Sequence, residues 1–342
     1  MTRNHPAVLL LGVVPSLTWM VARCLRRAGG APTILAWHAC APVMLTGDCR
    51  RYIRWKGLRR RGAHLDSGAL EHVRRLCRGG RIDAVIGADY DSALLLADPA
   101  WRHEIPSCAV PSASTIATFN DKWNFARLLD ALELPYPHSL RIRNGEELLD
   151  CALPFPIITK PLDRWASVGF EIHADRDVLA ARVRRGRLKS DFPLIAQTYV
   201  PGWDVGASFL AQRGRLAACS VFRHLRLGER IFYDSERVQD YLQRFVAAGN
   251  YSGVGHLDLR YDPAQDRYSI LELNPRFWAS LLYAAQAGLN YPDLLLGLQR
   301  QAAGPLATPR PGRIRLPPYE RLMTMSTRWF SSAYERATFA RL

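Results

Sequence analysis

Two short stretches of alternating residues constrain the fold of this chain more than any other feature. They are residues 255–260 (GHLDLR), with Leu257 and Leu259, and residues 271–276 (LELNPR), with leucine at alternate positions. A period of two is typical of half-buried β-strands. The intervening residues 261–267 are rich in turn-forming side chains, so the two strands are predicted to pair as an antiparallel hairpin.

The polar side chains of this hairpin form a candidate site. With the turn centred near Gln265, Asp258 lies opposite Glu272, and residues directly opposite each other share a face of the sheet. Asn274 and Arg276 follow Glu272 on that face at spacings of two and four residues. Two carboxylates and an amide oxygen beside a guanidinium suit Mg²⁺ that carries phosphate groups. The alternative is the solvated polar face of an ordinary hairpin.

Composition and charge narrow the class of protein. The 342 residues allow two or three subdomains, and 48% hydrophobic with 23% charged residues is typical of a globular chain. Seven cysteines without a Cys-x-x-Cys pair indicate reduced thiols in the cytoplasm and no zinc site. The net charge of +15 raises the hypothesis of a nucleic-acid partner. Because the basic residues are nearly all arginines spread along the chain, we expect an acidic substrate, or no specific partner for this charge, and no nucleic acid.

The N-terminal third has the pattern of a doubly wound α/β domain. Residues 7–14 form an apolar run, which Pro15 interrupts; it is too short to span a bilayer and lacks a signal-peptide cleavage site, so we expect a buried strand and no membrane association. The expected elements that follow are a helix over 17–28, a strand over 33–37, a helix over 67–76 and a strand over 82–87. No Gly-x-Gly-x-x-Gly follows the first strand, which disfavours a nicotinamide-dependent dehydrogenase.

Two of the four lysines stand at predicted element boundaries. Lys122 lies in the first turn of a helix that Asn120 or Asp121 would cap, and Lys160 lies at the end of a short strand over 154–161. A lysine at such a boundary can place its ammonium group on a phosphate. The alternative is a plain surface lysine.

The remaining segments are predicted more coarsely. A strand over 194–202 breaks at Pro-Gly and is followed by Asp204, and paired strands over 207–210 and 216–222 lead into a basic cluster, Arg223, His224 and Arg226. Beyond the hairpin we expect a helix over 277–287, another beginning at 290–292, a linker or wrapped strand over 303–318 and a last helix within 319–342.

Four motifs in order carry a resemblance to a known family. They are NDK at 120–122, IITKP at 157–161, QTYVPG at 197–202 and LELNPR at 271–276. In this order they resemble the ATP-grasp superfamily, and FWAS at 277–280 with AGLNYP at 287–292 resembles its bacterial carboxylate–amine ligase-like branch. The resemblance covers about residues 5–300. It implies a mixed α/β and α+β fold with four parts: a doubly wound, Rossmann-like pre-ATP-grasp domain (1–115), a small lobe (116–195), a large lobe (196–305) and a C-terminal extension (306–342).

The resemblance also implies roles for individual residues. Lys122 and Lys160 would contact the ATP phosphates, Gln197 the adenine amino group, the backbone of Tyr199 and Val200 the ring edge, and Asp204 the ribose. Asp258, Glu272 and Asn274 would hold one or two Mg²⁺ ions, with Mn²⁺ as an alternative. Arg276 would neutralise charge at the γ-phosphate or acyl phosphate, and Arg223, His224 and Arg226 would lie near the transferred phosphate or the acceptor.

The implied activity is ATP-dependent, ADP-forming ligation of a small carboxylate, such as an amino acid, to an amine. Such chemistry needs positioning and charge neutralisation more than covalent help from the protein. We expect the chain to assemble as a homodimer. Two alternatives keep the fold: a phosphotransferase, and a non-catalytic nucleotide-binding protein. The second is motivated by the loop over 162–169, in which Gly169 is the single glycine where the family usually has several.

Overall fold

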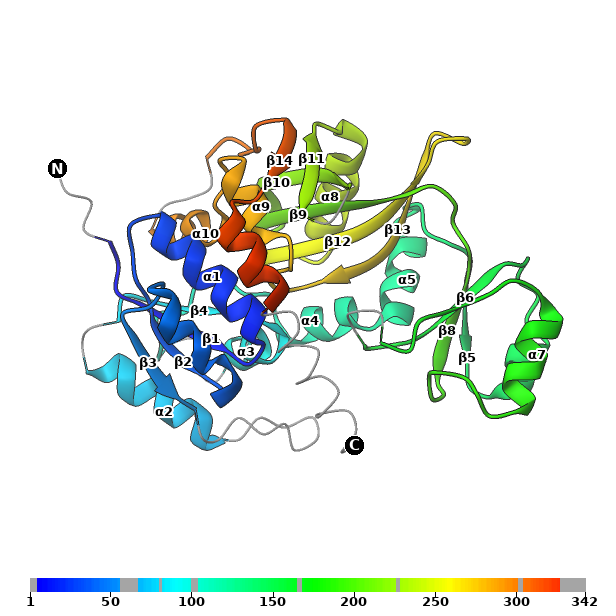
Figure 1. The fold of residues 1–342 in the computed structure, drawn as a ribbon, viewed down its shortest axis with the longest axis horizontal. Helices are drawn as coiled ribbons and strands as arrows, with labels where there is room; N and C mark the ends of the chain where they lie inside the picture. The colour runs from blue at the N-terminus through cyan, green and yellow to red at the C-terminus, as the bar shows by residue number, and fades with distance from the viewer. Residues whose placement is uncertain are drawn as a thin grey trace. The chain divides into compact units, whose positions relative to one another are not determined.

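The computed structural model describes residues 5–55, 67–79, 82–99, 104–164, 168–225, 228–300 and 304–326 (Figure 1). The chain divides into two compact units. Unit 1 consists of Met1–Ile116, Ser208–His256 and Pro275–Leu342, and unit 2 consists of Ala117–Ala207 and Leu257–Asn274. The four-part division expected from the sequence stays a prediction.

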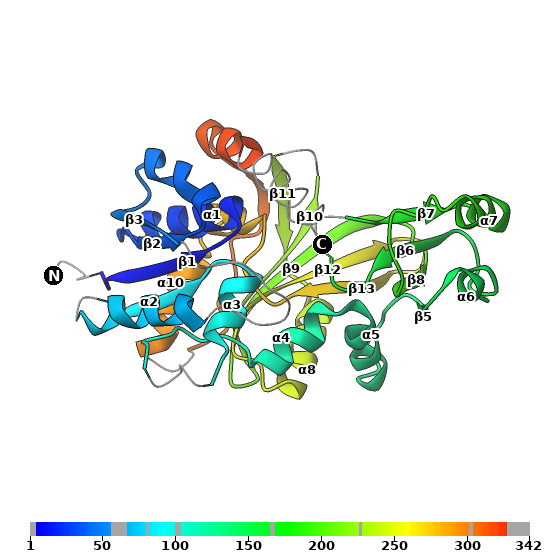
Figure 2. The same cartoon turned by 90° about the horizontal axis from the view of Figure 1, so that it is seen from below.

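Unit 1 contains the predicted doubly wound domain. Its parallel sheet has the order β3-β2-β1-β4, with β1 over Val8–Gly12, β2 over Thr33–Ala36, β3 over Arg51–Arg54 and β4 over Ala84–Gly87. All five residues of β1 are buried, because Leu10 packs on the side of α1 (Pro15–Arg27) and Leu9 and Leu11 pack on the side of α2 (Ser67–Arg78) and α3 (Tyr90–Leu96). Figure 2 shows α1 on one side of β1 and these two helices on the other.

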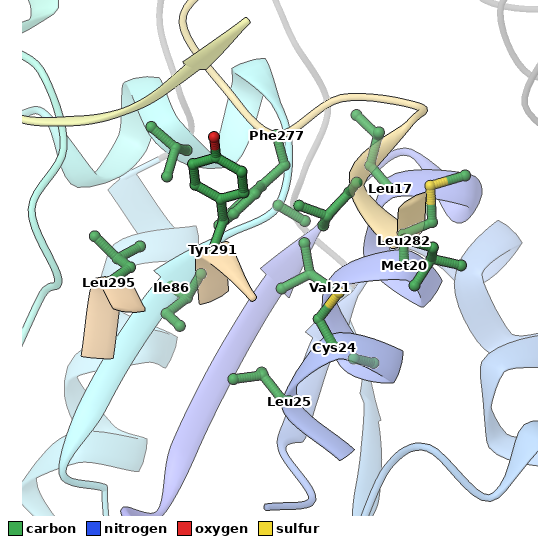
Figure 3. Close-up of a cluster of buried hydrophobic side chains, with 14 of the residues drawn as sticks. Leu17, Met20, Val21, Cys24, Leu25, Ile86, Phe277, Leu282, Tyr291 and Leu295 are labelled. Carbon is green, nitrogen blue, oxygen red and sulfur yellow. The ribbon is translucent and has the colours of Figure 1, made fainter. Parts of the chain in front are cut away.

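A core of aliphatic and aromatic side chains joins the distant segments of unit 1. Figure 3 shows Met20 and Val21 of α1 and Ile86 of β4 in the same cluster as side chains from residues 275–296. Helices α9 (Leu281–Gln286) and α10 (Tyr291–Arg300) supply Leu282 and Tyr291. This burial of apolar area is the main stabilising contribution to unit 1.

One predicted helix is shorter in the structure than expected. Residues 277–280 are not helical, and α9 begins at Leu281 instead of at residue 277. The rings of Phe277 and Trp278 are both buried in the core. A hydrogen bond of 3.2 Å from the Leu281 N–H to the Trp278 carbonyl closes a turn just before the helix. Packing of two adjacent large side chains therefore overrides the helical pattern.

A six-stranded sheet has the order β13-β12-β9-β10-β11-β14. Its strands are β9 (Trp203–Gln212), β10 (Arg215–His224), β11 (Glu229–Tyr233), β12 (Gly253–Asp262), β13 (Arg267–Asn274) and β14 (Gly312–Arg315). Helix α8 (Glu236–Ala248) packs against β10. The predicted hairpin is present as β12 and β13, whereas β11 and α8 were not predicted. The expected linker or wrapped strand contains β14, which pairs with β11.

Unit 2 contains a second sheet of four strands, with the order β5-β8-β6-β7. The strands are β5 (Ser139–Ile142), β6 (Ile157–Pro161), β7 (Glu171–His173) and β8 (Leu194–Thr198), and the helices are α5 (Lys122–Ala131), α6 (Gly145–Leu149) and α7 (Arg176–Arg184). The short helix α4 (Ala113–Asn120) precedes α5. Among the described residues, no helix has both the length and the apolar character that crossing a bilayer requires.

Candidate active site

The small sheet of unit 2 has one apolar and one polar face. Residues directly opposite each other share a face, and Gln197 of β8 lies opposite Ser139 of β5 and Ile158 of β6. Lys160 lies opposite Ile195 on the same face, which α5 covers through Ala126. The other face packs with α6 and α7 in an apolar cluster. The strand alternation therefore directs Lys160 and Gln197 to the same side of the sheet as α5.

Lys122 is held at the start of α5, as the sequence predicted. The side chain of Asp121 caps the helix by accepting a hydrogen bond from the Asn124 N–H at 2.8 Å. The Lys122 backbone N–H donates to the Leu162 carbonyl at 2.8 Å, and its ammonium group donates to the Arg164 carbonyl. Helix α5 is thus connected to the loop after β6, and Lys122 is buried, with 8% of its surface exposed.

Both lysines meet the hairpin at one oxygen atom. The Nζ atoms of Lys122 and Lys160 lie 3.4 and 3.9 Å from Oε2 of Glu272. In β13, Glu272 and Asn274 alternate with the buried Leu273, and Asn274 Nδ2 donates to Asp258 Oδ2 of β12 at 3.1 Å. Five side chains predicted from separate motifs therefore converge within unit 2.

Burial and charge act against each other at Lys160. The pKa of its ammonium group is lowered to about 8, mainly by desolvation, and the charge of the neighbouring Lys122 acts in the same direction. Glu272 and Asp258 raise it, but not enough to offset burial. A polyanion placed here would stabilise both ammonium groups, since it would add opposite charge at a site with little access to water.

The hairpin side chains fit a hard divalent cation. Asp258, Glu272 and Asn274 offer two carboxylates and an amide, and Mg²⁺ prefers oxygen ligands that it shares between protein and phosphates. Among the described residues, no group of three His, Cys, Asp or Glu side chains is arranged to hold a metal. The protein would therefore supply only part of the coordination shell, as is usual where a nucleotide supplies the rest.

The segment after β8 is fixed to β12. The Tyr199 N–H donates to the Pro156 carbonyl at 3.1 Å, so the Val200 N–H is the better candidate to pair with a ring edge. Arg260 donates to Asp204 Oδ1 at 2.9 Å and lies 5.6 Å from the centre of the Tyr199 ring. Gly202 has φ +99°, and a Cβ there would lie 1.9 Å from the Tyr261 carbonyl oxygen, so only glycine fits.

A cavity of about 420 Å³ lies beside the same segment. Its lining combines the segment after β8, the residues before β5 and the tip of the β12–β13 hairpin, and includes Tyr136, Tyr199, Val200 and Arg267. Neither Lys122, Lys160 nor Glu272 lines it. The cavity of unit 2 is therefore lined by the two residues predicted at the ring edge, Tyr199 and Val200, and by none of the residues predicted for phosphate or metal.

Two of the predicted basic residues of unit 1 lie on β10, and a third follows β13. Arg276 donates from Nη1 to the Phe277 carbonyl at 2.8 Å. On β10, His224 lies opposite Arg230 of β11 and Arg223 lies opposite Ile231, so Arg223 and His224 point to opposite faces of the sheet. Arg226 lies outside the described residues.

Arg230 was missed by the sequence reasoning. It is 9% exposed, its guanidinium lies 4.8 Å from the centre of the Tyr283 ring, and it shares a face with His224. The only sequence signal is the alternation in ERIFY at 229–233. That pattern identifies a strand but not the partner opposite Arg230.

A buried carboxylate occupies the turn between β1 and α1. Asp89 Oδ2 accepts hydrogen bonds from the backbone N–H groups of Val13 and Val14 at 2.6 and 2.8 Å. In dinucleotide-binding domains such N–H groups receive a phosphate. In this chain Asp89 accepts hydrogen bonds from these two N–H groups, so a protein carboxylate takes the position that a phosphate has in such domains.

No protein-family model matches the chain, but curated proteins do, among them a D-aspartate ligase and a D-alanine–D-alanine ligase. The chain is 24% identical over 202 residues to the D-aspartate ligase of Enterococcus faecium, an alignment that covers 50% of this chain and 47% of that protein. It is 28% identical over 215 residues to the D-alanine–D-alanine ligase of Gluconobacter oxydans, with coverage of 56% and 69%. The chain therefore spans about half the length of the first of these relatives.

Solved structures share the fold over most of the chain. The L-amino acid ligase of Bacillus licheniformis has a TM-score of 0.65 at 18% identity, covering 87% of this chain and 75% of that one. The ADP complex of an N5-carboxyaminoimidazole ribonucleotide synthetase has a TM-score of 0.62 at 14% identity, covering 98% and 99%. The biotin carboxylase domain of a Hydrogenobacter thermophilus carboxylase, solved with MgADP, has a TM-score of 0.68 at 13% identity, covering 91% and 74%.

Proposed function

This chain belongs to the ATP-grasp superfamily, and from that premise we propose that it is an ATP-dependent, ADP-forming carboxylate–amine ligase. The observation that carries the proposal is the meeting of Lys122 and Lys160 at one carboxylate oxygen of Glu272, within unit 2. Two buried ammonium groups next to oxygen ligands are the parts that binding of a magnesium-bound triphosphate requires.

Different residues of unit 2 would contact different parts of the nucleotide. Lys122 and Lys160 would contact the phosphates as point charges, and Asp258, Glu272 and Asn274 would hold Mg²⁺ or Mn²⁺. When bound, the metal neutralises charge on the β- and γ-phosphates. Gln197 and the Val200 N–H would contact the base, with Asp204 at the ribose hydroxyl groups.

The proposed reaction has two steps. A carboxylate oxygen of the first substrate attacks the γ-phosphorus of ATP, which forms an acyl phosphate and releases ADP. The amine of the second substrate then attacks the acyl carbon, and inorganic phosphate leaves with its electron pair as the amide forms. In both steps the protein would supply position and positive charge, the latter from the two lysines and from Arg276.

We propose amino acids as both substrates. The relatives are named for joining D-aspartate or D-alanine, and a solved neighbour is named an L-amino acid ligase. On unit 1, Arg223, His224 and Arg226 are proposed near the transferred phosphate or the acceptor. Arg230 extends this set, since it shares a face with His224 and could pair with a substrate carboxylate.

The test is an incubation with ATP, MgCl₂ and a panel of D- and L-amino acids. ADP and phosphate should appear in amounts equal to a dipeptide or amide detected by mass spectrometry, and omission of either substrate should stop product formation. Release of AMP and pyrophosphate would contradict the proposal. A phosphorylated product that needs no amine would identify a phosphotransferase, and nucleotide binding without turnover would identify a non-catalytic protein.

We further propose a cytoplasmic location and a homodimeric assembly. The seven cysteines are all free thiols, and five of them are buried, which suits a reducing compartment. Size-exclusion chromatography with light scattering measures the assembly, and a monomeric mass would remove the dimer. Replacement of MgCl₂ by MnCl₂ in the ligase assay tests whether Mn²⁺ serves equally.

A further inference from the structure

The side chain of Gln197 is held in one orientation by Ser139. Both residues are buried, Gln197 with 4% of its surface exposed, and they lie directly opposite each other in β8 and β5. Gln197 Nε2 donates to Ser139 Oγ at 2.7 Å. Ser139 Oγ in turn donates to the Pro137 carbonyl at 2.6 Å.

This chain of hydrogen bonds fixes which end of the amide faces outward. A serine hydroxyl has one proton, and the Pro137 carbonyl takes it. Ser139 Oγ can then only accept, so the end of Gln197 that meets it is the NH₂ group. If the amide were turned over, Gln197 Oε1 would face Ser139 Oγ, and both oxygens would be acceptors. Ser139 could donate to Oε1 only by giving up its buried hydrogen bond to the Pro137 carbonyl.

The amide oxygen is the end that remains for a ligand. Among the described residues, Gln197 Oε1 accepts no hydrogen bond, although the rest of the side chain is buried. Gln197 shares its sheet face with Lys160, the lysine proposed to contact phosphate. The polar face of the small sheet thus presents a hydrogen-bond acceptor for a base and an ammonium group for a phosphate.

We infer that Ser139 is a positioning residue that makes the nucleotide site selective for a 6-amino purine over a 6-oxo purine. This rests on the proposed function in so far as Gln197 faces the base. A 6-amino group donates to Oε1. A 6-oxo group would place a second acceptor against it and lose the hydrogen bond. With Ser139 unable to donate, Gln197 cannot turn over to suit the 6-oxo base.

The experiment compares the affinities of ATP and inosine triphosphate by isothermal titration calorimetry, with MgCl₂ and without amino acids. The unmodified protein should prefer ATP by about tenfold or more, since a buried hydrogen bond is at stake. Ser139→Ala frees the amide to turn, so the preference should fall to about threefold or less, mainly through tighter binding of inosine triphosphate. Ser139→Thr keeps the hydroxyl and should keep the preference.

Ser190→Ala is the matched control, because Ser190 is equally buried in unit 2 but donates to the Gly169 carbonyl. It should leave the preference for ATP unchanged. If Ser139→Ala does not fold, the preference for ATP is measured in Gln197→Met, which removes the amide oxygen and should likewise lower the preference to about threefold or less. An unchanged preference in either variant, or no preference in the unmodified protein, overturns the inference.

The binding measurement separates this inference from the proposed ligase activity. A protein that prefers ATP through Ser139 but releases no ADP with any amino acid would retain the inference and lose the ligase proposal. A protein that ligates amino acids equally well with either nucleotide would retain the ligase proposal and lose the inference.

Discussion

The ammonium group of Lys122 lies 3.4 Å from the carboxylate of Glu272, although one residue begins a helix and the other lies in a strand far along the chain. Lys122 also donates to the Arg164 carbonyl in the loop after β6. This single side chain therefore joins a helix, a loop and the hairpin of unit 2. Ion pairs of buried lysine are retained where a group of opposite charge compensates burial.

Glu272→Gln should abolish turnover while the fold remains. The substitution removes one proposed metal charge and the partner of two ammonium groups, and we expect at least a 100-fold loss of kcat, about 3 kcal/mol of transition-state stabilisation. Initial rates of ADP release measure the loss, and circular dichroism checks the fold. Glu146→Gln, an exposed glutamate on α6 of the same unit, is the control and should leave the rate unchanged. A rate within threefold of the unmodified protein would remove Glu272 from the site.

Lys160→Ala should weaken nucleotide binding. Removal of a buried cation next to the phosphates should raise the Kd for ATP about tenfold or more, as loss of a charge-assisted hydrogen bond does. Isothermal titration with ADP and ATP measures the change. Lys189→Ala removes an exposed lysine from the same unit and should leave both affinities unchanged. An unaltered ATP affinity in Lys160→Ala would count against its phosphate role.

ATP binding should weaken as pH rises above about 8. Burial lowers the pKa of the Lys160 ammonium to about 8, so the group is charged below that pH and loses its proton above it. The phosphates bind the charged form, and binding would therefore raise this pKa and take up a proton in weakly alkaline buffer. Titrations from pH 7 to pH 9 measure the affinity. Lys160→Arg stays charged over this range, so its affinity for ATP should change little with pH.

Glu320→Gln should destabilise unit 1 without affecting the nucleotide site. Glu320 is 1% exposed and accepts hydrogen bonds from Arg23 Nε at 2.9 Å and from Arg27, which fixes the helical residues 318–326 to α1. Both arginines keep some contact with water, so we expect a loss of about 2–3 kcal/mol in the free energy of unfolding. Urea denaturation measures it. Glu236→Gln, at an exposed glutamate of α8, should cost less than about 1 kcal/mol.

The sequence by itself determined the local geometry of this protein. The alternation around Asp258 and Glu272 predicts the hairpin, and the apolar runs predict the buried parallel strands. The position of Lys122 after a capping residue predicts its place at a helix start, because side chains one or two turns apart decide capping and amphipathicity. The residues proposed for phosphate and metal could be named because they stand in short motifs, with Glu272 and Asn274 sharing one of them.

Only the tertiary structure decided which of these residues meet. The contact of Lys122 and Lys160 with one oxygen of Glu272, the pairing of Ser139 with Gln197, and the hydrogen bonds of Asp89 with the turn after β1 all join segments far apart along the chain. The pairing of β10 with β11 places Arg230 beside His224, and the burial of Phe277 and Trp278 shortens a predicted helix. The hydrophobic periodicity of the sequence indicates which side of a helix or strand faces inward. The residue that packs against that side depends on strand register and on packing between distant segments.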